Sequence, residues 1–214
     1  MAINLQKGQT IDLRKNDKGE DAYDLSQVTI GLGWDVRQKQ KGLLGKLFSA
    51  KEEEFDLDAI AFLLDENDKV INIGDKQLKG GDVIFYNSLK HQSGQIWLTG
   101  DNRTGAGEGD DEQIIVRLNS LDEKYKKILF VVSIYQGQKN NQHFSMVENA
   151  FIRAVDAKGK EITKYSLSGN TSLNGMCSMV FSEVYRHNGG WKFRAIGEPE
   201  ATDAFVQILK RYTY

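Results

Sequence analysis

The sequence predicts an all-β fold, a β-sandwich of two mostly antiparallel sheets with a C-terminal helix. Short runs rich in Val, Ile, Phe and Tyr recur along the chain, Gly, Asn and Asp separate them, and helical periodicity is hard to find. Runs of this kind are typical of strands. Many closely spaced strands favour a sandwich over a parallel α/β sheet.

Ten segments carry the strand pattern: residues 28–32, 55–64, 83–86, 95–98, 114–118, 128–135, 150–155, 162–165, 177–185 and 191–196. The last two flank Asn188-Gly189-Gly190, which is typical of a hairpin turn. We expect the helix at residues 202–211, where Thr202 is placed to cap it and Phe205, Ile208 and Leu209 recur at helical spacing.

Length and composition limit the class of protein. The 214 residues suffice for one domain with a real core, and the formal net charge of −2 provides no global field that would attract nucleic acid. The one cysteine, Cys177, cannot form an internal disulfide, and the chain begins without the pattern of a secretory signal. No apolar run approaches the roughly 20 residues of a spanning helix. We therefore expect a single cytoplasmic domain over residues 1–214, with no nucleic acid as partner.

Residues 37–54 interrupt the strand pattern and are expected to form an exposed insertion. The first half of this segment is basic and apolar, and the segment ends in three glutamates. One hypothesis is that residues 39–48, with three lysines and several apolar side chains, contact a partner or the inner surface of the membrane. Three lysines supply only about 1 kcal/mol each near anionic lipid, so a surface loop without a partner remains the alternative.

The most informative segment runs from residue 100 to 112. It carries five carboxylates against one cation, Arg103, for a formal charge of −4, and it is rich in glycine. Crowded carboxylates raise one another's pKa unless a cation neutralises them, and glycines let backbone carbonyls turn inward. Calcium takes roughly 6–8 oxygen ligands of these kinds. The segment therefore predicts a calcium site.

A second acidic pair supports this interpretation. Strand alternation places Asp56 and Asp58 on one face, while Phe55 and Leu57 point to the other face, toward the core. If this strand lies beside the acidic segment, the two together offer enough carboxylates for about two calcium ions. An EF-hand is excluded, because its third and sixth positions would be Arg103 and Ala106.

Other interpretations of these residues remain open. An acidic, glycine-rich stretch can be a solvated loop. Paired carboxylates that hold two divalent ions also occur in hydrolases of phosphate-containing substrates, although no histidine or lysine lies near these acids in sequence. We expect no catalysis here. The three histidines have no paired spacing and are expected at the surface, and Cys177 is expected to be buried and inert.

Several strings resemble the signatures of the TerD family of tellurium-resistance and stress proteins. The segment GDNRTGAGEGDDE at residues 100–112 is similar to the family's acidic signature, with Ala106 where the family usually has Glu and Glu108 where it usually has Asp. The strings VTIGLGWD at 28–35, FDLDA at 55–59 and VENAFIR at 147–153 resemble further family marks. The insertion, at residues 42–48, looks most like the TerZ branch.

The resemblance implies a β-sandwich that binds two calcium ions in a bacterial cytoplasmic stress-resistance system, with other proteins of that system as partners. Carried over position by position, it implies the following metal ligands: Asp35, Asp56, Asp58, Asp101, Asn102, Gly107 through its carbonyl, Glu108, Asp110, Asp111 and Glu112. Of these, Asp35 is included for its place after the Gly-Leu-Gly-Trp turn.

Overall fold

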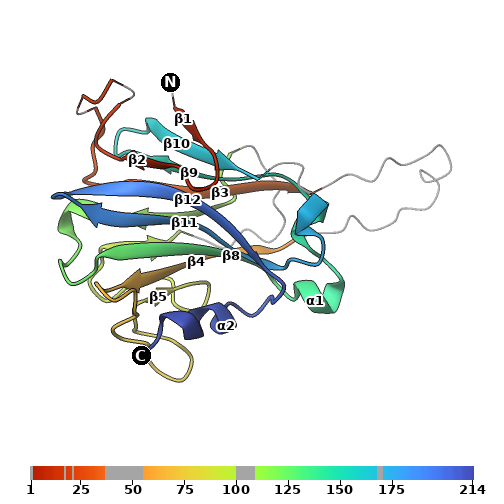
Figure 1. The fold of residues 1–214 in the computed structure, drawn as a ribbon. Coiled ribbons are helices and arrows are strands. Elements are labelled where there is room, and N and C mark those ends of the chain that lie inside the picture. The colour runs from red at the N-terminus through yellow and green to blue at the C-terminus, as the bar shows by residue number, and fades with distance from the viewer. Residues whose placement is uncertain (1, 17, 21, 37–54, 100–108, 168–170) are drawn as a thin grey trace.

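The computed structural model describes residues 2–16, 18–20, 22–36, 55–99, 109–167 and 171–214. Within these ranges the chain forms two six-stranded sheets that lie face to face (Figure 1). The predicted β-sandwich is confirmed. The predicted insertion at 37–54 lies outside the described residues, and the expectation of a single domain over 1–214 stays a prediction.

The first sheet contains the strands that carry the VTIGLGWD and VENAFIR strings. Its order is β1 (Ile3–Leu5), β10 (Glu161–Ser166), β9 (Val147–Val155), β3 (Val28–Val36), β7 (Glu112–Val116) and β6 (Ile96–Leu98). All neighbours in this sheet are antiparallel except β1 and β10, which run parallel.

The second sheet is antiparallel throughout. Its order is β2 (Thr10–Asp12), β12 (Gly190–Glu200), β11 (Ser178–His187), β8 (Lys127–Ile134), β4 (Leu57–Leu64) and β5 (Val83–Ile84). Strands β11 and β12 form the predicted hairpin, and Asn188 and Gly189 both have positive φ, at 48° and 71°. Positive φ at both central residues matches the right-handed twist of the flanking strands, which explains the turn sequence.

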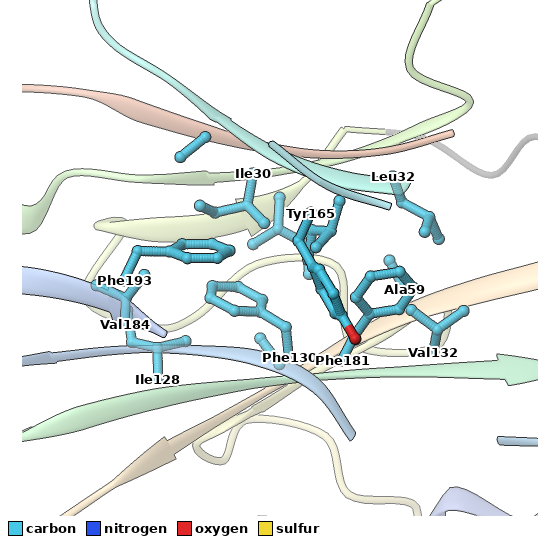
Figure 2. Packing of buried hydrophobic residues seen from close by; sticks show 14 of the residues in the cluster. Ile30, Leu32, Ala59, Ile128, Phe130, Val132, Tyr165, Phe181, Val184 and Phe193 are labelled. Atoms are coloured by element: carbon cyan, nitrogen blue, oxygen red, sulfur yellow. The ribbon is translucent and has the colours of Figure 1, made fainter. Parts of the chain in front are cut away.

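The main core lies between the two sheets. Alternate residues of each strand point inward, as Ile30 and Leu32 do from β3 and Phe130 and Val132 do from β8 (Figure 2). Burial of these side chains follows from the period of two along a strand, because one face of each sheet is removed from water.

The second sheet also buries part of its outer face, in a smaller cluster. Helix α2 (Phe205–Leu209) packs Phe205, Ile208 and Leu209 against Ile60 and Phe62 of β4. The helix and the C-terminus therefore lie on the outer side of this sheet (Figure 1). The remaining helical segments are short: α1 (Gly137–Asn140), η1 (Leu118–Ser120), η2 (Phe144–Met146), η3 (Thr171–Leu173) and η4 (Lys210–Tyr212).

All ten predicted strands are confirmed, and the C-terminal helix is confirmed with a later start. Its N-cap residue is Ala204, so Thr202 does not cap it. The Thr202 hydroxyl instead accepts a hydrogen bond from the N–H of Ala204 in the turn before the helix. The α-helix ends at Leu209, and a 3-10 turn continues the chain to Tyr212.

Candidate metal centre

Six of the ten predicted ligands lie in the described part of the chain, near one end of the sandwich. Asp35 is close to the end of β3, Asp56 and Asp58 are at the start of β4, and Asp110 and Asp111 precede Glu112, the first residue of β7. The other four predicted ligands lie outside the described residues: Asp101, Asn102, Gly107 and Glu108. Because β3 and β7 are antiparallel with Leu32 opposite Glu112, the end of one strand meets the start of the other.

Glu112 joins the two acidic elements across the sandwich. Its side chain belongs to the first sheet, yet its Oε2 accepts a hydrogen bond of 2.6 Å from the N–H of Ala59 in β4. That N–H is available because β5 pairs with β4 only at Ala61 and Phe62. Glu112 is 2% exposed, so this charge-assisted bond lies in a region of low dielectric. This hydrogen bond places the start of β7 beside β4 at this point, a proximity that the sequence left open.

The Asp-x-Asp pair follows the predicted alternation. Phe55 and Leu57 lie in the core between the sheets, and Asp58 lies on the opposite face, buried beside Tyr86. Burial raises the pKa of the Tyr86 hydroxyl, and the negative charge of Asp58 raises it further. Asp56 is half-buried, and its carbonyl accepts a hydrogen bond from the N–H of Tyr135.

Asp111 is held against β3 by two hydrogen bonds. Its N–H donates to the carbonyl of Leu32 at 2.8 Å, and its Oδ2 accepts from the N–H of Trp34 at 2.9 Å. Burial raises the pKa of its carboxyl, the bond from Trp34 lowers it, and the charges of Asp35 and Asp110 raise it again, with a net rise. Burial, the largest cause, disfavours the ionised carboxylate, and the two neighbouring acids disfavour it further.

Asp110 has a cation of the protein itself as partner. Its Oδ1 accepts from Nε of Arg153 at 2.7 Å, and Nη1 of Arg153 also reaches Glu161 at 2.9 Å. The carboxylate lies over Gly31, where an added Cβ would come within 2.2 Å of it. Glycine at this position is therefore required by the close approach of Asp110 to β3. The Arg153 guanidinium therefore compensates the charge of Asp110.

Two residues of the site were missed from the sequence, namely Arg153 and Asn149. Both belong to the VENAFIR string, but their partners become visible only from the pairing of β9 with β3, which places Arg153 opposite Gly31. Nδ2 of Asn149 donates to Oδ2 of Asp35 at 2.7 Å. Asn149 has a positive φ of 52° at the register shift of this pairing, a conformation that Asn tolerates better than most residues.

The comparison with known families explains why these strings occur together. The model of the TerD domain matches residues 1–212, which is nearly the whole chain. This chain belongs to the TerD-domain family. The tellurium resistance protein TerX of Serratia marcescens is 56% identical, and the alignment covers 99% of this chain and 100% of that protein. The stress response protein SCP2 of Bacillus subtilis is 39% identical, with 99% and 100% covered.

Sequence identity differs between the TerX and TerZ relatives and is low for the solved structure with a similar fold. TerZ of Serratia marcescens is 40% identical over 91% of this TerD-domain chain and 89% of TerZ, so overall the chain is more similar to TerX than to TerZ. The fold matches the crystal structure of a TerD homologue from Streptomyces coelicolor, SCO6318, with a TM-score of 0.60. That comparison covers 85% of this chain and 94% of the other, at 20% identity, and it supports the fold alone.

The described carboxylates of this TerD-domain protein are candidate metal ligands that do not form a complete cage. Among the described residues, no group of three or more His, Cys, Asp or Glu side chains is arranged to hold a metal ion. The donors at this end are nonetheless all oxygen atoms, which suit a hard cation such as calcium. The net rise in the pKa of Asp111 is also the electrostatic environment that a bound cation would relieve.

Two expectations about other reactive side chains have different outcomes. Cys177 is buried as expected, and burial raises the pKa of its thiol, so it is a poor nucleophile. The expectation that all three histidines lie at the surface is wrong for His91, which is 3% exposed. Its ring is buried because a carboxylate, Asp82, provides a hydrogen-bonding partner in the interior.

The described residues contain no helix that is both long and apolar enough to cross a membrane.

Proposed function

We propose that this TerD-domain protein binds calcium where the acidic segment meets the start of β4, and that it acts as a calcium-dependent binding or scaffold module in tellurium resistance or the stress response. The observation that carries the proposal is the hydrogen bond of Glu112 to the N–H of Ala59, because it ties the two acidic motifs together across the sandwich. The family membership and the names of TerX and SCP2 support the cellular role.

The ligands proposed from the described residues are Asp35, Asp56, Asp58, Asp111 and Glu112. The predicted ligands Asp101, Asn102, Gly107 and Glu108 would complete the set. Calcium would supply the positive charge that neutralises these carboxylates. Asp110 was predicted as a ligand as well, and its ion pair with Arg153 gives it a second role, in which it fixes the chain entering β7 over Gly31.

The cellular context is part of the same proposal. We propose a cytoplasmic protein whose partners are other proteins of the same resistance system, and nucleic acid is not among them. Contact of residues 39–48 with the inner membrane surface remains a hypothesis. Loss of liposome binding after deletion of these residues would support it, and unchanged sedimentation would count against it.

A divalent-metal-dependent hydrolase of phosphate-containing substrates is the alternative. Such sites commonly need a group that transfers protons near the metal. In the described part of the site, Arg153 is bound to Asp110 and Glu161, and its guanidinium stays protonated, so it does not transfer protons. This environment favours binding over turnover.

Isothermal calorimetry on chelator-treated protein tests the proposal, with calcium as titrant and magnesium as competitor. We expect about two ions per chain and weak competition by magnesium, since magnesium demands stricter octahedral geometry. The double variant Asp58→Asn and Asp111→Asn should lose binding, and Glu66→Gln, which neutralises an exposed acid elsewhere, should retain it.

Two outcomes would contradict the proposal. A folded protein that gives no heat with calcium would have no calcium site. Hydrolysis of a phosphate ester that requires magnesium or manganese, and that is lost in the double variant, would instead establish the hydrolase.

A further inference from the structure

A buried polar network lies apart from the candidate metal centre, and it joins the residues that precede β5 and β8. Asp82 precedes β5, His91 lies in the connection from β5 to β6, and Tyr125 precedes β8; these residues are 0%, 3% and 1% exposed. Nε2 of His91 is 3.0 Å from Oδ1 of Asp82, and the Tyr125 hydroxyl donates to the same oxygen at 2.7 Å. The network ends at an exposed serine, Ser93.

The hydrogen bonds fix the ionisation of Asp82. Burial raises the pKa of this carboxyl, but the bonds from His91, Tyr125 and the N–H of Asn72 outweigh burial and lower it overall. The N–H of Asn72 donates to Oδ2 at 2.8 Å, so both oxygens accept hydrogen bonds. Asp82 is therefore a carboxylate at neutral pH, and the Nε2 atom of His91 carries the hydrogen that it accepts.

The other ring nitrogen of His91 is consequently a base. The N–H of Ser93 donates to Nδ1 at 3.2 Å, which requires a lone pair on that nitrogen and hence a neutral imidazole. Oγ of Ser93 lies 2.7 Å from the same Nδ1. Because the N–H of Gln95 donates to this Oγ at 3.2 Å, the hydroxyl hydrogen is left to point toward Nδ1. Ser93, His91 and Asp82 thus have the mutual contacts and protonation states of a nucleophile, its base and the group that orients the base.

We propose that Ser93 is an acyl-accepting nucleophile toward small carboxylic esters, with His91 as its catalytic base and Asp82 as the residue that positions the base. Ser93 is exposed, so a small ester reaches its hydroxyl from solvent. This activity is independent of the proposed calcium binding.

The reaction needs only the ester and water, and protons and electrons are conserved in each step. Oγ of Ser93 forms a bond to the carbonyl carbon of the ester as its proton moves to Nδ1 of His91. The carbon–oxygen bond to the alcohol then breaks, and the leaving alkoxide takes the proton from His91. Water releases the acid from the acylated serine by the same proton route, which restores the hydroxyl.

The chain contains a second histidine–serine pair for comparison, in which the serine is half-buried whereas Ser93 is exposed. Oγ of Ser145 lies 2.8 Å from Nδ1 of His143, again with two residues from histidine to serine. Within the described part of the chain, no carboxylate bonds to Nε2 of His143. A hydrogen-bonded turn alone would leave Ser93 as unreactive as Ser145, whereas a base oriented by Asp82 makes Ser93 the more reactive of the two.

The test uses the full-length protein with two reagents, p-nitrophenyl acetate and a fluorophosphonate probe, and mass spectrometry locates the adducts. We expect modification of Ser93 at a rate at least about 10²-fold above that of Ser145, the usual range for general-base assistance. Ser93→Ala should abolish the adduct, and Ser145→Ala should leave it unchanged.

Ser93 is exposed, so Ser93→Ala is expected to keep the fold, which circular dichroism verifies. His91→Gln should lose the reactivity of Ser93, but it alters a buried group, so the comparison of Ser93 with Ser145 in the unmutated protein decides the matter. Equal modification of the two serines, or no adduct at Ser93 in folded protein, would overturn the proposal. The assay is repeated with a chelator, so that failure of calcium binding and failure of acyl transfer are separate results.

Discussion

Each buried or half-buried carboxylate of this protein behaves according to its immediate partner. Asp110 meets Arg153, Glu112 meets a backbone N–H, and Asp82 accepts three hydrogen bonds. The sequence shows that these acids exist but not which donor each one meets, because the folding of the chain decides which donors come within reach. The partner nevertheless decides whether the acid is compensated, as Asp110 is, or has a raised pKa, as Asp111 has.

The hydrogen bond from Tyr125 to Asp82 should make a pH-dependent contribution to stability. We expect Tyr125→Phe to lower the free energy of unfolding by about 1–2 kcal/mol at pH 7, because it removes a buried donor to a charged acceptor. The pKa of Asp82 is lowered by folding from an ordinary value of 3.8, so the stability from its ionised form is present above that value. It is lost as the pH falls through the lowered pKa.

The difference between the unmutated protein and Tyr125→Phe should therefore shrink below about pH 4. Urea unfolding at several pH values measures this difference in the free energy of unfolding. Groups that titrate alike in both proteins cancel when one free energy is subtracted from the other. Tyr165→Phe is the control, since burial alone raises the pKa of that tyrosine and no carboxylate contributes. A difference that stays constant down to pH 2.5 would contradict the assigned role of Asp82.

At the scale of strands and helices, the sequence was most informative where one face is buried. Short runs rich in Val, Ile, Phe and Tyr located ten strands, and the Asn-Gly pair located the hairpin turn. Strands β1 and β2 were missed because both are short and most of their side chains are exposed or only partly buried, so neither carries an apolar run. The start of α2 was placed too early because Thr202 is a good capping residue, whereas its hydroxyl is used in the preceding turn.

Helix α2 should contribute to stability through the face that it packs on the second sheet. Leu209 is 1% exposed in the cluster with Phe62, and Val206 of the same helix is 43% exposed. We expect Leu209→Ala to lower the free energy of unfolding by about 2–4 kcal/mol, because it removes buried methyl groups and leaves a cavity. Val206→Ala should change it by less than about 0.5 kcal/mol. Equal effects of the two substitutions in urea unfolding would show that the helix lies elsewhere in solution.

At the scale of the whole molecule, the sandwich class followed from the sequence, but the strand order did not. The start of β7 and the start of β4 belong to different sheets, and only the packing of the sheets brings Glu112 to Ala59. For this reason the sequence singled out these acids as candidate ligands but did not predict how they meet. The role of Arg153 depends likewise on the pairing of β9 with β3.

The shared core predicts that both sheets unfold together, as one domain over the whole chain. Trp34 on β3 and Trp191 on β12 both point into the core between the sheets, so one core contains reporters from each sheet. Separating the sheets would expose the inner faces of both at once, which favours a single cooperative transition. The variant Trp191→Phe retains the tryptophans of the first sheet, Trp34 and Trp97. The double variant Trp34→Phe and Trp97→Phe retains only Trp191, in the second sheet.

Within each variant, tryptophan fluorescence and far-ultraviolet circular dichroism should give the same urea midpoint, at a fixed calcium concentration. The comparison is made inside one variant, so a loss of stability caused by the substitution shifts both signals equally. Distinct midpoints in either variant would mean that one sheet survives the loss of the other, and residues 1–214 would then be two folding units.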